Sequence, residues 1–105
     1  MAREKFQNLT EPMFYILLCL MEERCGTDIM NKVKDMTDGR VIIGPGTLYA
    51  LLDRFLEEGY IKETSSEGRK RNYKITVAGK QALSTEYIRL QALAADYRTY
   101  AGLEG

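Results

Sequence analysis

The chain has 105 residues, with 15 basic and 15 acidic side chains and no histidine, so its formal net charge is zero. A length of this order predicts one compact unit with a thin core, and such small domains often gain stability by oligomerising. Without histidine the chain has no Ser/His or Cys/His catalytic dyad and no His-ligated metal.

Cysteine content and hydropathy also restrict the class of protein. Cys19 and Cys25 have no second cysteine pair beside them, so they form neither a zinc site nor a disulfide framework. The longest apolar run, Met13 to Met21, has nine residues, far fewer than the ~20 that a membrane span needs. Acidic residues precede this run and no small-residue cleavage site follows it, which argues against a signal peptide. We therefore expect a cytoplasmic protein with two reduced thiols, no cofactor, no metal and no membrane partner.

Helical periodicity is the main signal in the first half of the sequence. Thr10 is a suitable N-cap and Pro12 is tolerated in a first turn, so a helix is expected to begin there. Gly26 interrupts the apolar pattern, while Pro45 and Gly59 are the residue types favoured at the start and just past the end of a helix. We therefore predict a short β-branched strand over 41–43 and three helices over about 11–23, 27–37 and 45–58.

The second half predicts a hairpin followed by a long helix. Two alternating stretches, 60–65 and 72–75, flank a turn at Ser66-Glu67-Gly68, and Thr76 caps a helix expected from about 77 to 101. Three helices and a hairpin are the plan of a winged helix. The predicted fold class is therefore mainly α (α+β), a winged helix-turn-helix with a two-stranded wing and a long C-terminal dimerisation helix. Residues 1–76 would form the DNA-binding domain and 77–105 the dimerisation helix, together one compact unit.

Basic side chains gather around the predicted hairpin. Between Lys62 and Lys80 there are six basic residues and two acidic ones. Three of them follow the turn in a row, where a wing is expected to contact DNA phosphates. A basic run on a hairpin also serves as a solvated edge that blocks strand–strand aggregation, and that alternative is the stronger one for the run alone. Together with the start of the third helix, the run favours DNA binding.

The start of the third helix is the sharpest local feature. Gly46 allows close approach to another backbone, and exposed amides there favour a phosphate. Thr47 and Tyr49 offer hydroxyls on the side away from the core, Ala50 suits a thymine methyl, and Arg54 can reach a phosphate or a guanine edge. The alternative is a capped helix whose glycines only shape the turn, and the residues alone leave both open. The candidate DNA-binding residues are Gly46, Thr47, Tyr49, Ala50, Arg54, Arg69, Lys70, Arg71 and Lys74.

Three segments, Leu9 to Leu17, Gly44 to Tyr49 and Gly68 to Thr76, resemble the PadR family of bacterial transcriptional regulators. The similarity extends from about Leu9 to Leu90. It implies a winged-helix dimer that represses genes at inverted-repeat operators and is relieved by a small molecule. The single C-terminal helix resembles the smaller PadR subfamily, whose members often respond to hydrophobic compounds. Two positions depart from the family pattern, because aromatic residues are common where this chain has Thr27 and Asn72.

The last helix carries apolar residues at alternating spacings of four and three, a heptad seam that predicts packing against a partner helix. The alternative is that this stripe folds back onto its own domain. The predicted dimer residues are Leu83, Tyr87, Leu90, Ala94, Tyr97 and Ala101. A pocket for a flat aromatic ligand is also predicted where the last and first helices meet, with plain dimer core as the alternative. Its candidate residues are Phe14, Tyr15, Tyr87, Leu90, Leu93, Ala94 and Tyr97.

The sequence thus favours a dimeric, sequence-specific DNA-binding regulator over an enzyme, because no paired-carboxylate or nucleophile constellation appears at a recognisable spacing. The alternative is a winged-helix protein-interaction module without direct DNA binding. The expected partners are double-stranded DNA with an inverted-repeat operator, a second copy of the chain, and a small aromatic ligand.

Overall fold

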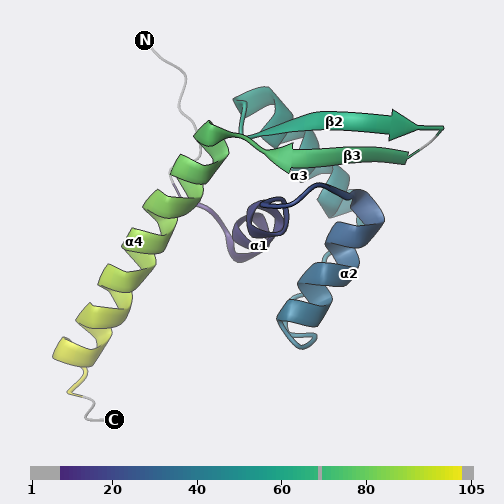
Figure 1. Ribbon diagram of the computed structural model, residues 1–105. Helices are drawn as coiled ribbons and strands as arrows, with labels where there is room; N and C mark the ends of the chain where they lie inside the picture. The colour runs from purple at the N-terminus through teal and green to yellow at the C-terminus, as the bar shows by residue number, and fades with distance from the viewer. Residues whose placement is uncertain (1–7, 69, 103–105) are drawn as a thin grey trace.

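The computed structural model describes residues 8–68 and 70–102, and it has the predicted order of helices followed by a hairpin and a long helix (Figure 1). The predicted winged-helix fold class is confirmed. The elements are α1 (Glu11–Cys19), β1 (Arg24–Cys25), α2 (Gly26–Met36), α3 (Pro45–Glu58), β2 (Ile61–Glu67), β3 (Lys70–Ile75) and α4 (Val77–Tyr100).

Local chemistry explains where most of the helices begin and end. The Thr10 hydroxyl accepts the Met13 amide at the start of α1, and the Thr76 hydroxyl accepts the Gly79 amide at the start of α4. Gly59 ends α3 in the left-handed conformation at φ 78°, which glycine adopts without a Cβ penalty. All three residues were predicted in these roles.

Several boundaries differ from prediction. Ser66 and Glu67, predicted to lie in the turn with Gly68, pair with Arg71 and Lys70, so β2 extends to Glu67 and β3 begins at Lys70. The helix α1 ends at Cys19 rather than near Glu23, because the carbonyl of Leu20 accepts the amide of Ile75 and the chain then enters β1. The predicted strand at 41–43 is a loop, in which Val41 is held by hydrogen bonds to Thr37. Its alternation of buried and exposed residues is that of a strand, but it has no strand partner among the described residues.

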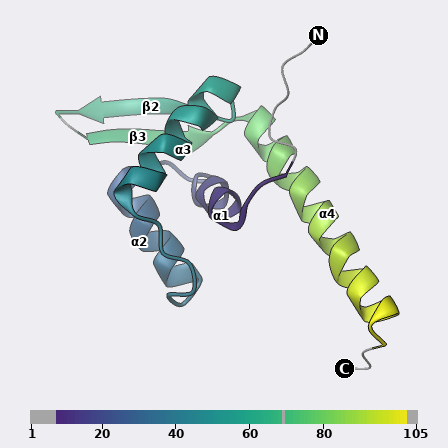
Figure 2. The ribbon, with the colours of Figure 1, turned by 180° about the vertical axis from the view of Figure 1, so that it is seen from behind.

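The sheet is antiparallel with the order β1–β3–β2. The strand β1 contributes only two pairs, Arg24 with Tyr73 and Cys25 with Asn72, whereas β2 and β3 form the longer hairpin that we call the wing. The tip of the wing and the far end of α4 lie on opposite sides of the molecule (Figures 1 and 2).

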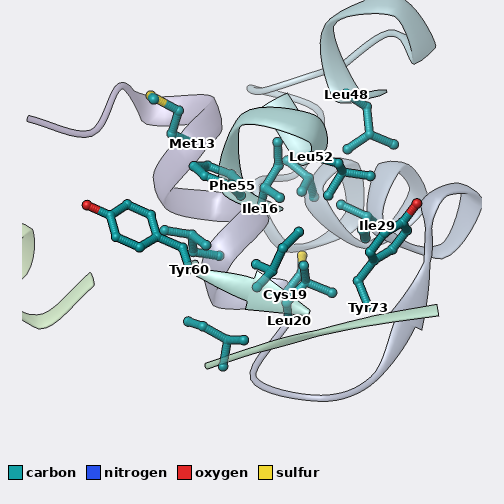
Figure 3. Packing of buried hydrophobic residues seen from close by; sticks show 14 of the residues in the cluster. Met13, Ile16, Cys19, Leu20, Ile29, Leu48, Leu52, Phe55, Tyr60 and Tyr73 are labelled. Carbon is teal, nitrogen blue, oxygen red and sulfur yellow. The ribbon is translucent and has the colours of Figure 1, made fainter. Parts of the chain in front are cut away.

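The core lies between α1, α2, α3 and one face of the sheet (Figure 3). Its most deeply buried large side chains are Phe55, Ile16, Leu17, Leu20, Ile29, Leu48, Leu52 and Val33. Cys19 and Cys25 are free, buried thiols, and burial raises the pKa of Cys19 above its ordinary value.

Only the first part of α4 packs against this body. Its buried residues are Gly79, Leu83 and Glu86, and the residues beyond Arg89 are exposed. The Glu86 carboxylate accepts the backbone amide of Leu9 at 3.1 Å and pairs with Arg89. The Arg89 guanidinium and the Leu9 amide hold the pKa of Glu86 below its ordinary value, so this carboxylate ties the chain before α1 to α4 in its charged form. No helix in the described part of the chain is long and apolar enough to cross a membrane.

Candidate nucleic-acid interface

The N-terminus of α3 is open to a partner. Gly44, Pro45, Gly46 and Thr47 are all exposed. The N-cap residue is Gly44, which has no side chain to accept a hydrogen bond from the first turn. A Cβ placed on Gly46 would meet no atom of residues 8–68 or 70–102 within 4 Å, so the glycine makes no close approach to the backbone of these residues. Pro45 has no N–H, so Gly46 and Thr47, which are both exposed, carry the first amides of α3, and no side chain of the described residues caps this end of the helix.

The exposed side of α3 has two distinct faces. Thr47, Ala50 and Arg54 are exposed and spaced three and four apart, so they share one face of the helix. Tyr49 and Asp53 share a second face, which is turned toward the wing and the start of α2. The core residues Leu48, Leu52 and Phe55 fix the orientation of both faces.

Tyr49 packs across the start of α2. It is 45% exposed, and a Cβ added to Gly26 would lie only 2.3 Å from its hydroxyl oxygen. Gly26 therefore leaves the space that the phenol occupies. From the sequence Gly26 was identified only as a helix breaker, and its spacing from Tyr49 offers no signal of this contact.

The start of α2, α3 and the wing enclose a cleft of about 690 Å³, which we call the wing cleft. It is lined by Cys25, Gly26, Thr27, Tyr49, Asp53, Gly68, Lys70, Arg71 and Tyr73. Three of the predicted DNA-binding residues, Tyr49, Lys70 and Arg71, thus meet in one place.

The other predicted DNA-binding residues lie around this cleft or outside the described residues. Gly46, Thr47, Ala50 and Arg54 are exposed along α3. Lys74 is half-buried on β3 and is not among the lining residues of the wing cleft. Arg69 lies outside the described residues. Sequence reasoning did not identify Thr27, Asp53 and Tyr73 as lining residues, because only the fold brings them to the cleft.

Arg71 has an acidic neighbour on the adjacent strand. Its Nε lies 3.8 Å from the Glu63 carboxylate, and both side chains remain substantially exposed. An exposed pair of this kind contributes little to stability, so Arg71 can exchange Glu63 for another anion at low cost.

Burial raises the pKa of the neighbouring Tyr73, which keeps its hydroxyl neutral in the physiological range.

A second, apolar groove of about 320 Å³ lies between α1 and α4. It is lined by Phe14, Leu18, Met21, Lys80, Leu83, Ser84 and Tyr87. Of the predicted ligand residues, only Phe14 and Tyr87 line it, while the Tyr15 hydroxyl accepts a hydrogen bond from Arg40 at 2.9 Å. Leu18 and Met21 were not identified as groove residues from the sequence, although Leu18 lies four residues after Phe14 on the same face of α1 and Met21 follows in the turn after the helix.

The predicted dimer seam is mostly exposed in the single chain. Leu83 is buried against its own domain, whereas Tyr87, Leu90 and Tyr97 are 54%, 40% and 59% exposed. Ala94 and Ala101 on the same face, and Leu93 beside it, are also exposed. The seam thus begins inside the domain and continues along α4 beyond it.

The sequence of this chain matches the model of one protein family. Residues 16–85 match the model of the transcriptional regulator PadR-like family. No curated protein sequence matches the chain.

Solved structures share the fold over most of the chain. A transcriptional regulator from Clostridium thermocellum is 24% identical and superposes with a TM-score of 0.75, over 83% of this chain and 89% of that one. A PadR-like transcription factor from Bacteroides fragilis is 28% identical with a TM-score of 0.68, over 82% and 85% of the two chains. A PadR family transcription regulator from Clostridium difficile is 22% identical with a TM-score of 0.66, over 84% and 97%.

Proposed function

This chain belongs to the PadR-like family of transcriptional regulators, and we propose that it binds double-stranded DNA as a homodimer and represses transcription from an inverted-repeat operator. The observation that carries this proposal is the meeting of Tyr49 on α3 with Lys70 and Arg71 of the wing around one cleft, beside the uncapped start of α3. In a winged helix the third helix enters the major groove and the wing contacts the backbone, so these two elements reach one duplex together.

Each part of this surface suits one kind of contact. The amide of Gly46 and the cations of the wing, Lys70 and Arg71 with Arg69, suit phosphates. Thr47 and Ala50 project from the exposed face of α3 and suit base edges and a thymine methyl. Arg54 and Lys74 complete the proposed set together with Tyr49, whose ring packs against Gly26 at the start of α2.

The proposed dimer uses the exposed seam of α4. The seam residues Leu90, Ala94 and Tyr97 continue the face of α4 that is buried at Leu83, and a second copy of the helix can cover them. A two-fold dimer places its two recognition helices about one helical turn of DNA apart, so the preferred site is an inverted repeat.

Neutralising the wing should weaken binding to every DNA sequence alike. In the triple variant Arg69→Gln, Lys70→Gln, Arg71→Gln, the log–log salt dependence should flatten by about 0.9 per lost phosphate contact, and so by at most ~2.7 per subunit. The measurement is fluorescence anisotropy on an operator selected from a random DNA pool, over a series of salt concentrations.

The matched control removes three exposed cations that do not line the wing cleft, in the variant Lys32→Gln, Lys34→Gln, Arg98→Gln. It should keep the wild-type salt slope. An unchanged slope in the wing variant would show that the wing does not touch the backbone. A random pool that yields no enriched sequence would favour the alternative function, a protein-interaction module.

We also propose that a small, flat aromatic ligand binds beside the dimer seam and relieves repression. The apolar groove with Phe14 and Tyr87, and the exposed Leu90 and Tyr97 farther along α4, support this site. Rings stacked on such side chains gain ~0.5–1.5 kcal/mol beyond the area that they bury.

A planar cationic dye should therefore bind more tightly than millimolar, quench tyrosine fluorescence and raise the melting temperature. Tyr97→Ala should weaken this binding, whereas Tyr100→Ala, which removes an 85% exposed ring at the end of α4, should not. Equal dye binding by the wild type and Tyr97→Ala would rule out the proposed ligand site, and the seam would then serve only as the proposed dimer interface.

A further inference from the structure

Glu23 lies in the turn before β1, and its carboxylate reaches across the sheet to the wing. Its Oε2 atom accepts hydrogen bonds from the Thr64 hydroxyl at 2.6 Å and from the Ser65 hydroxyl at 3.1 Å. The side-chain amide of Asn72 on β3 donates to the same Ser65 hydroxyl at 3.0 Å. These four side chains therefore join the β1 side of the sheet to β3 and β2, and we call them the wing clamp.

A β-bulge makes the wing clamp possible. The pairing of β2 with β3 shifts between Glu63 and Ser65, which leaves Thr64 as the extra residue. In a regular strand consecutive side chains point to opposite faces of the sheet, so Thr64 and Ser65 could not share one acceptor. The bulge re-aims one of them, and both hydroxyls then meet the same carboxylate oxygen.

The wing clamp lies where the wing loses its third strand. The outermost pair made by β1 is Cys25 with Asn72, and the cations Arg71 and Lys70 follow immediately on the two-stranded part. A two-stranded hairpin without further support is marginally stable in water. Lys70 and Arg71 therefore lie beyond the point where Glu23 holds β2.

The electrostatics favour a charged Glu23. The hydroxyls of Thr64 and Ser65, and then the nearby Lys74, hold the pKa of Glu23 below its ordinary value. The carboxylate is therefore a permanent acceptor near neutral pH, although it is exposed and carries the same sign as DNA.

We infer that Glu23 is a positioning residue for DNA binding, because its carboxylate holds the wing at the angle from which Lys70 and Arg71 reach the phosphates. This inference rests on the proposed function. It also gives a role to Asn72, which departs from the family pattern and here completes the wing clamp.

The sign of one mutational effect tests this inference. Removing an acidic side chain close to DNA strengthens binding if only long-range electrostatics act. We expect the opposite for Glu23→Ala: binding to the selected operator weaker by about tenfold, and a flatter salt dependence by roughly one phosphate contact per wing. Glu23→Gln keeps an acceptor oxygen for the two hydroxyls and should restore most of the affinity.

The matched control is Glu22→Ala, which removes the same charge from the neighbouring exposed residue outside the wing clamp. It should bind operator as tightly as the wild type or more tightly. Operator binding by Glu23→Ala at wild-type strength or above, with an unchanged salt slope, would overturn the inference.

Amide hydrogen exchange of the free protein separates this inference from the proposed function. Glu23→Ala and Thr64→Val should both speed exchange in the strands of the wing, whereas Glu22→Ala should not. If the wild type binds no DNA, the proposed function fails, and faster exchange still shows that Glu23 positions the wing. Unchanged exchange in both clamp variants would overturn the inference whatever the DNA result.

Discussion

Replacing Leu90 by aspartate should convert the proposed dimer to a monomer and abolish the proposed operator binding. Leu90 lies in the middle of the seam, on the same face of α4 as the buried Leu83, and is 40% exposed in the single chain. The part of α4 beyond Arg89 leaves the body on the side away from the wing, and its residues are exposed (Figure 1). A partner helix would enclose the new carboxylate without a counter-charge, which costs several kcal/mol, roughly 3 or more.

Sedimentation at micromolar concentration measures this effect, and circular dichroism checks that the helices persist. Ile88→Asp is the matched control, because Ile88 is 62% exposed and lies on the opposite side of α4 from the seam. It should remain a dimer and bind operator. A wild-type chain that sediments as a monomer, or a Leu90→Asp variant that remains a dimer, would rule out the α4 interface.

The fold could be predicted where local chemistry decides it. Thr10 and Thr76 cap their helices because a hydroxyl accepts an amide within the first turn, and Gly59 ends α3 because only glycine adopts its conformation without strain. Such signals need no knowledge of the rest of the chain. Three helices, a hairpin and a last helix then follow in order, and this order predicts the winged helix.

The elements that depend on distant pairing could not be predicted. The strand β1 has two residues, too few to show a period, and it exists because β3 offers an open edge beside it. The same edge takes the carbonyl of Leu20 and shortens α1. The stretch at 41–43 has strand-forming side chains, but its alternate residues fill the core from a loop.

The candidate site shows the same division. The cations of the wing and the glycine-rich start of α3 could be recognised as candidate DNA contacts from the sequence, because a run of charges and a glycine-rich helix start are both visible within a few consecutive residues. The contact of Tyr49 with Gly26 and the hydrogen bonds from Thr64 and Ser65 to Glu23 join residues that are more than 20 positions apart. No signal of the clamp was visible in the sequence, because Thr64 and Ser65 were interpreted as the end of a regularly alternating strand, whereas the pairing shifts between Glu63 and Ser65.

Replacing Gly79 by alanine should destabilise the whole protein. A Cβ at this position would lie 2.2 Å from the carbonyl oxygen of Tyr60 and 2.7 Å from a side-chain carbon of Ile75. The Tyr60 carbonyl cannot move easily, because it accepts the backbone amide of Thr76, the N-cap of α4, at 2.9 Å. The start of α4 must therefore move away from the sheet, which weakens the packing of Leu83 and the bond from Leu9 to Glu86.

We expect the free energy of unfolding to fall by about 3 kcal/mol, a large part of the ~5–15 kcal/mol that holds a domain folded. Urea unfolding followed by circular dichroism measures it. Gly46→Ala is the matched control, since Gly46 also lies in the first turn of a helix and its Cβ would meet none of the described residues within 4 Å. Alanine favours a helix over glycine by up to ~1 kcal/mol, so this control should unfold at the same urea concentration or a higher one. Equal midpoints for the two variants would mean that α4 does not need its close approach to the turn at Tyr60.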